Sequence, residues 1–129
     1  TNVLAEDIDI IACEAAHKIT DERNQAILNL RNQNAASTID GVTFRRVFID
    51  SDIAMLVGLT RVKGTVRNLR FEDVHVRGKM NGRHFITTEE DGNVTGISFG
   101  NVTIDGQPAQ ADGDPKHWSL TGSNINLTP

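Results

Sequence analysis

The stretch Val66-Arg-Asn-Leu-Arg-Phe-Glu-Asp-Val-His-Val76 decides the fold, because the chain repeats its pattern on both sides. The copy before it is Ile39-Asp-Gly-Val-Thr-Phe-Arg-Arg-Val-Phe-Ile49, and the copy after it is Val94-Thr-Gly-Ile-Ser-Phe-Gly-Asn-Val-Thr-Ile104. Apolar residues fall at offsets 0, 3, 5, 8 and 10 in every copy, and the central one is always phenylalanine. The central phenylalanines are 27 and then 28 residues apart. A fixed period of this size predicts a solenoid, in which each repeat buries its apolar face against its neighbours.

Each copy contains two short strand patterns separated by a bend. Apolar residues two apart lie on one face of a strand, whereas the spacing of three in the middle interrupts that alternation. Polar residues or glycine occupy the interruption, and a second corner lies three residues before each phenylalanine, where glycine or asparagine accepts left-handed backbone angles. The bends are at Arg45-Arg46, Glu72-Asp73 and Gly100-Asn101, and the corners are at Gly41, Asn68 and Gly96.

A further apolar run follows each of the first two copies, at residues 54–57 and 85–86. Several short strands per repeat, joined by corners, are typical of a parallel β-helix. The predicted fold class is therefore all-β: a right-handed parallel β-helix, a single-stranded solenoid of about five coils.

The same pattern extends more weakly in both directions within one domain. Upstream, alanine takes the place of the phenylalanine and residues 26–30 supply a later strand; downstream, glycine takes that place. The upstream positions are Val3, Ala5, Ile8 and Ile10, and the downstream positions are Leu120, Gly122, Ile125 and Leu127. The predicted coils lie near residues 1–38, 39–65, 66–93, 94–117 and 118–129.

The leucine-rich horseshoe is the alternative repeat, since its period and its first apolar positions are similar. Its consensus needs asparagine or cysteine three residues after the third leucine. Valine occupies that position here, at Val47, Val74 and Val102. Long helical segments between the strands are also lacking, so the sequence excludes the horseshoe.

The composition and charge of the chain argue against two classes of partner, nucleic acids and membranes. The 129 residues carry a net charge of −4, and the 13 basic residues are not clustered, which argues against a nucleic-acid partner. No apolar run approaches the length of a membrane span, so no membrane partner is predicted. The single cysteine, Cys13, excludes an internal disulfide framework and, in its apolar surroundings, is expected to be buried and inert.

The two ends of the pattern differ. The first repeat begins at Thr1 without a capping segment, whereas Asp112-Gly-Asp-Pro115 and Trp118 are suited to close the last coil. We therefore expect the C-terminal part of a longer β-helix, whose partner is the missing N-terminal part or a self-associated copy. Three Asn-x-Thr sequences, which β-helices also generate by accident, favour a secreted or extracellular location.

The segments Gly64–Gly78 and Asn93–Gly106 resemble the late coils of β-helical glycoside hydrolases. That group includes the polygalacturonases, and the closest similarity is to the dextranase and isopullulanase branch. The run Ala26–Arg31 leading to Ile39–Phe44 resembles another such coil. The resemblance implies the C-terminal part of a polysaccharide-acting hydrolase, which forms solenoid coils and one wall of a glycan cleft. The expected partner is a polysaccharide or oligosaccharide substrate, and no cofactor is expected.

No catalytic residue is predicted in this chain. The hydrolases in question carry their carboxylates on earlier coils, often as adjacent aspartates, and the sequence has no Asp-Asp pair. Glycoside hydrolysis needs two carboxyl groups at a fixed separation. The chain alone is therefore expected to be inactive, with the catalytic carboxylates upstream. Because coil patterns also occur elsewhere, a tailspike- or adhesin-like module, structural or carbohydrate-binding, and a fragment of a β-helical lyase or epimerase stay open.

Five residues are candidates for substrate binding. The resemblance places a substrate-contacting basic residue at Arg31, and strand alternation places Asn29 on the same face; a solvated strand arginine is the simpler alternative. His17 with Asp21 or Glu22 could serve in acid–base chemistry or in a carbohydrate contact. In a helix, His17 and Asp21 would instead form a surface pair one turn apart.

Other polar clusters have simpler explanations. No metal site is predicted, because the acidic run at residues 88–92 lacks the fuller Asp-x-Asp-x-Asp-Gly pattern of a calcium loop. His75 and His84 lie in different repeats without metal-ligand spacing, so no role is assigned to them. Trp118 has two interpretations, stacking on a sugar ring or covering the last coil.

Overall fold

The structure is a computed structural model that describes residues 2–10, 26–31 and 34–128. In these residues the protein is all-β and contains no helix. The strands are β1 (Val3–Ile10), β2 (Ala26–Arg31), β3 (Thr38–Ile49), β4 (Met55–Val62), β5 (Thr65–Val76), β6 (His84–Thr88), β7 (Asn93–Ile104), β8 (Gln107–Pro108), β9 (Trp118–Thr121) and β10 (Ile125–Asn126).

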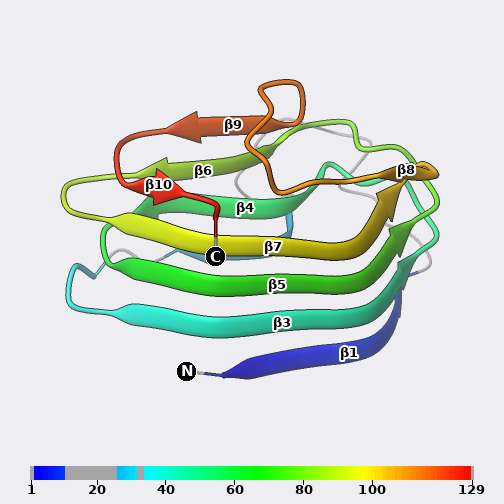
Figure 1. The fold of residues 1–129 in the computed structure, drawn as a ribbon, viewed down its shortest axis with the longest axis horizontal. Helices are drawn as coiled ribbons and strands as arrows, with labels where there is room; N and C mark the ends of the chain where they lie inside the picture. The colour runs from blue at the N-terminus through cyan, green and yellow to red at the C-terminus, as the bar shows by residue number, and fades with distance from the viewer. Residues whose placement is uncertain (1, 11–25, 32–33, 129) are drawn as a thin grey trace.

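The strands form two sheets, and successive strands along the chain alternate between them, apart from the short β8. One sheet has the order β1-β3-β5-β7-β10 and the other the order β2-β4-β6-β9. All neighbours in these two orders are parallel, and among the described strands β8 alone pairs antiparallel, with β7. Figure 1 shows β1, β3, β5 and β7 stacked one above another as one layer, with the second sheet as another layer. The prediction of an all-β chain with parallel repeats is confirmed, and this arrangement is compatible with a β-solenoid.

The strand register matches the sequence repeat residue for residue. Phe44 lies opposite Phe71, and Phe71 lies opposite Phe99. The ring centroids of the two pairs are 5.3 and 5.2 Å apart, so the three repeated phenylalanines form one column across the sheet. The first pair is stacked at 9°, whereas Phe99 meets Phe71 edge-on at 71°. Ala5 lies opposite Phe44, so the upstream extension of the pattern is also confirmed.

The predicted bends and corners have left-handed backbone angles. At the corners, φ is 81° at Gly41, 57° at Asn68 and 74° at Gly96. At the bends, the second residue of each pair has φ between 53° and 54°: Arg46, Asp73 and Asn101. β3, β5 and β7 therefore each bend at the same two positions along the strand, which keeps the apolar columns aligned from repeat to repeat.

The downstream extension of the pattern is wrong by several residues. Leu120 lies in β9 opposite Ile86, in the second sheet, and the next copy begins at Ile125, opposite Val94. The segment 105–117, between β7 and β9, is longer than the segment 77–83 between β5 and β6. Because of this insertion, β9 begins later in the chain than the repeat period predicts. Leu120, which belongs to β9, was therefore assigned to the start of a new copy.

Candidate functional site

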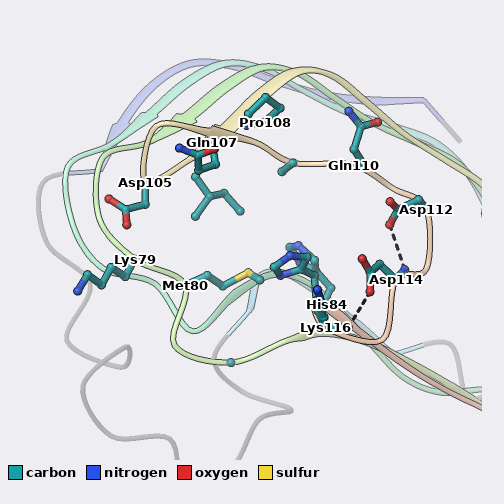
Figure 2. A pocket seen from close by; sticks show the side chains of 14 residues that line it. Lys79, Met80, His84, Asp105, Gln107, Pro108, Gln110, Asp112, Asp114 and Lys116 are labelled. Carbon is teal, nitrogen blue, oxygen red and sulfur yellow. Dashed lines mark hydrogen bonds between the residues drawn. The ribbon is translucent and has the colours of Figure 1, made fainter.

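A cavity of about 630 Å³ lies where the last repeat departs from the earlier ones. Three segments line it: residues 79–84 before and at the start of β6, residues 104–110 around β8, and residues 112–117 before β9. Figure 2 shows Asp105 and Lys79 on one side of the cavity and Asp112 and Asp114 on the other. The lining combines carboxylates, amides and imidazoles with a few apolar side chains.

A tight hairpin builds one wall of this cavity. Asp105 and Gly106, with φ of 53° and 74°, form a two-residue turn of the kind that Asp-Gly favours. The turn folds β8 back onto β7, and the Ala109 amide then donates to the Val102 carbonyl at 2.9 Å. After β3 and after β5 the chain crosses directly to the second sheet, so among the described residues the hairpin and the cavity belong to the last repeat.

The opposite wall is a turn held by two aspartates. An Asp112 carboxylate oxygen accepts the Asp114 amide at 3.0 Å, and an Asp114 carboxylate oxygen accepts the Lys116 amide at 3.0 Å. Aspartate side chains that accept an amide two residues further along are typical of tight turns. Each carboxylate has a second oxygen that these two hydrogen bonds do not use.

His84 lies in the lining of the cavity and is only 1% exposed. Its Nδ1 atom accepts the backbone amides of Leu56 and Val57, each at 3.3 Å. Burial, with a smaller contribution from nearby His117, lowers the pKa of His84 to about 3. An imidazole that accepts at Nδ1 is neutral and carries its proton on Nε2. His84 thus stabilises the start of β4, a role that the sequence did not indicate.

Trp118 is buried behind the cavity. Its ring lies 4.6 Å from the His84 ring and 5.8 Å from the Phe99 ring, and only 2% of the residue is exposed. Its Nε1 atom donates to the Gln110 carbonyl at 3.0 Å. Trp118 therefore covers the end of the core, and its stacking on a sugar is ruled out by its burial.

We expect His84 to make folding stability depend on pH between 6.5 and 3. The unfolded chain protonates this histidine near pH 6.5, whereas the folded protein keeps it neutral to about pH 3. Its contribution is therefore complete above pH 6.5 and is lost as the pH falls. Between pH 7.5 and pH 5, urea unfolding should show a loss of about 2 kcal/mol. The pKa values of Asp7, Asp40 and Glu89 are lowered from 3.8, 3.8 and 4.5, so these carboxyl groups affect stability mainly below pH 5.

The matched variants for this prediction are His84→Gln and His75→Gln. Glutamine at position 84 offers a carbonyl to the same amides without titrating, so the loss at pH 5 should shrink to a few tenths of a kcal/mol. His75 bonds Thr103 Oγ1 at 2.8 Å in another part of the fold, and its replacement should leave the loss unchanged. An unaltered pH dependence in His84→Gln would contradict the assignment.

The residues predicted for substrate binding lie elsewhere or outside the described residues. Asn29 and Arg31 belong to β2, where their Cα partners are Gly58 and Thr60 of β4. The strand order β2-β4-β6-β9 separates β2 from the β6 and β9 ends that border the cavity. The predicted residues His17, Asp21 and Glu22, and also Cys13, fall outside the described residues.

The cavity residues were missed because their signals are also turn signals. Asp105-Gly106 and Asp112-Gly113-Asp114 are typical of any tight turn. The local sequence does not indicate that the two turns lie on opposite sides of one cavity. The one available indication was the long interval between β7 and the next apolar run. An insertion on a repeat scaffold is a common place for binding groups.

The acidic run at residues 88–92 forms surface ion pairs in the structure. Glu89 contacts Arg61 at 2.7 Å, and Glu90 contacts Lys63 at 3.5 Å. Among the described residues, no group of histidine, cysteine and acidic side chains is arranged to hold a metal ion. Nor do these residues include a helix of the length and apolarity needed to cross a membrane.

Comparison of the chain with known protein families, with curated proteins and with solved structures found no match.

Proposed function

We propose that the chain forms coils of a right-handed parallel β-helix and is the C-terminal part of a polysaccharide-acting glycoside hydrolase. The repeat supports the fold: successive strands along the chain, apart from the short β8, alternate between two sheets, and connections between parallel strands are right-handed in nearly all proteins. In this proposal the protein is secreted, and the catalytic carboxylates lie upstream of this chain.

The observation that carries a glycan-binding role is the polar cavity between the Asp105 hairpin and the Asp112–Asp114 turn. Sugars present many hydroxyl groups, and carboxylates and amides are the side chains that bond them as acceptors and donors. Rigid strands support both walls, so the binding groups are held in place before a ligand arrives. Because the carboxylates of Asp112 and Asp114 already stabilise a turn, we assign the cavity to ligand binding and not to catalysis.

The test is to measure, by calorimetry, the binding of oligosaccharides from dextran, pullulan and polygalacturonate to this chain. Asp105→Asn removes the charge but suits the left-handed angle of the turn, and Gln110→Ala removes the side chain but keeps the carbonyl that bonds Trp118. Each should weaken binding of the preferred glycan about tenfold. Asp50→Asn, an exposed aspartate at another corner, is the control and should bind normally.

Absence of binding to all three glycans, or unchanged binding in both cavity variants, would refute the glycan-binding role of the cavity. Sugar release should be measured with the 129-residue chain alone as well. Hydrolysis by this chain would contradict the position given to the catalytic carboxylates.

A further inference from the structure

The ring of His84 carries one hydrogen-bond donor that no described residue satisfies. Because Nδ1 accepts the amides of Leu56 and Val57, the ring proton is on Nε2. Within the described part of the chain, no acceptor bonds this Nε2–H group. The residue is nevertheless only 1% exposed. A buried donor without an acceptor costs free energy, so the group marks a place for an acceptor atom from outside the chain.

The packing around the His84 ring directs this donor to the cavity. Nδ1 points to the start of β4, while the Trp118 and Phe99 rings lie against the imidazole at 4.6 and 5.6 Å. The two nitrogens of an imidazole point in widely different directions, so the Nε2–H bond points away from β4. His84 also lines the cavity, and Figure 2 shows it between Met80 and Asp114. The Nε2–H group therefore opens onto the cavity.

The aspartates of the cavity wall are acceptors, the complement of this donor. Asp112 and Asp114 each use one carboxylate oxygen in their turn and have a second oxygen that the turn does not use. Neither forms an ion pair with another described residue. Two exposed lysines, Lys79 and Lys116, balance only part of the charge of the lining aspartates, and Figure 2 shows Lys79 directed away from His84. The cavity thus combines a buried donor with carboxylate acceptors.

Of the hydroxyl, carboxylate and ammonium groups that sugars carry, the hydroxyl alone suits both kinds of group. It accepts the hydrogen bond of the His84 Nε2–H group and donates its own proton to a carboxylate. A sugar carboxylate accepts from His84 but has no proton to donate, and the aspartates repel its charge. A sugar ammonium group donates to the aspartates but leaves His84 without an acceptor.

We infer that the His84 Nε2–H group donates to a hydroxyl oxygen of a neutral sugar in this cavity, and that Asp112 and Asp114 accept from hydroxyl groups of the same sugar. The volume of about 630 Å³ is ample for such a ligand, since small-molecule sites span about 300–1,000 Å³. This inference rests on the glycan-binding role proposed above and narrows it to neutral glycans.

The probes are glucose, glucosamine and glucuronate, which share one ring and differ in the charge of a single substituent. NMR spectra of the 129-residue chain with isotope-labelled histidine report both nitrogens of each imidazole, and His84→Gln identifies the His84 signals by their loss. The free protein should show the His84 proton on Nε2, and glucose should shift that Nε2 signal. Glucosamine and glucuronate should each bind about tenfold more weakly, because each leaves one group of the cavity unsatisfied.

The double variant Asp112→Asn with Asp114→Asn tests the acceptors. Asparagine keeps one oxygen for the turn amides, but it replaces the second oxygen with a donor and removes the charge. Glucuronate should then bind within about threefold of glucose, with the His84 signal still shifting. Asp91→Asn, at an exposed aspartate in the turn after β6, is the control and should keep the preference for glucose.

Four results would overturn the inference: a His84 proton on Nδ1, a His84 signal that none of the sugars shifts, equal binding of the three sugars, or a preference that the double variant keeps. The proposed function fails separately. If oligosaccharides bind and Asp105→Asn weakens them while the His84 signal stays unmoved, the cavity binds glycans and the role of His84 is refuted. If glucose shifts the His84 signal but no oligosaccharide binds, the inference holds and the polysaccharide-binding role is refuted.

Discussion

Phe71→Ala is expected to lower the free energy of unfolding by about 3–5 kcal/mol. Phe71 is 1% exposed and lies in the middle of the phenylalanine column, 5.3 Å from the Phe44 ring and 5.2 Å from the Phe99 ring. Alanine would leave a cavity between two repeats that their backbone register prevents from closing. Urea unfolding followed by circular dichroism measures the effect.

Phe48→Ala is the matched control for this substitution. Phe48 belongs to the neighbouring strand but faces outward, is 54% exposed and contacts mainly the His75 ring, at 5.6 Å. Its loss should cost less than about 1 kcal/mol. Similar losses for both substitutions would mean that the column does not hold the repeats together, and the register between β3, β5 and β7 would need revision.

Local pattern was enough to predict the three central repeats. The apolar spacing fixed which side chains share a column, and the Gly41 and Asn68 corners were readable because few residues adopt left-handed angles without cost. The register follows from these two facts, since a shift by one residue would turn the apolar set of each strand to the opposite face.

The cavity and the last repeat could not be predicted from the local sequence pattern. The length of segment 105–117 determines where β9 lies, but the sequence of that segment is ordinary turn chemistry. His84 is a second example: the amides that its ring accepts inside the fold, those of Leu56 and Val57, come from the previous repeat. A histidine is more often exposed or partly exposed than fully buried. Neither the identity of this residue nor its position in the repeat therefore predicted a buried structural role.

Gly92→Ala is expected to cost about 3 kcal/mol or more, because the backbone of the previous repeat occupies the space of the added methyl group. A Cβ atom on Gly92 would overlap the carbonyl group of Val62, at the end of β4. That carbonyl also accepts the Glu89 amide at 2.9 Å, and the Glu89 carbonyl accepts the Gly92 amide at 2.9 Å. The methyl group would therefore push apart the turn and the strand end on which it rests, at the cost of overpacking and of a buried hydrogen bond.

Gly100→Ala tests whether this effect comes from contact between repeats or from the loss of any glycine. Gly100 lies on the surface of β7, and the atom nearest to its added Cβ would be the Phe71 carbonyl oxygen at 4.0 Å. With space available and an ordinary φ, alanine there should raise stability by about 0.5 kcal/mol, since it restricts the unfolded chain. Thermal and urea unfolding of the two variants should thus differ in sign. If Gly92→Ala were as stable as Gly100→Ala, the turn after β6 would not pack against β4, and the stacking of these two repeats would have to be reconsidered.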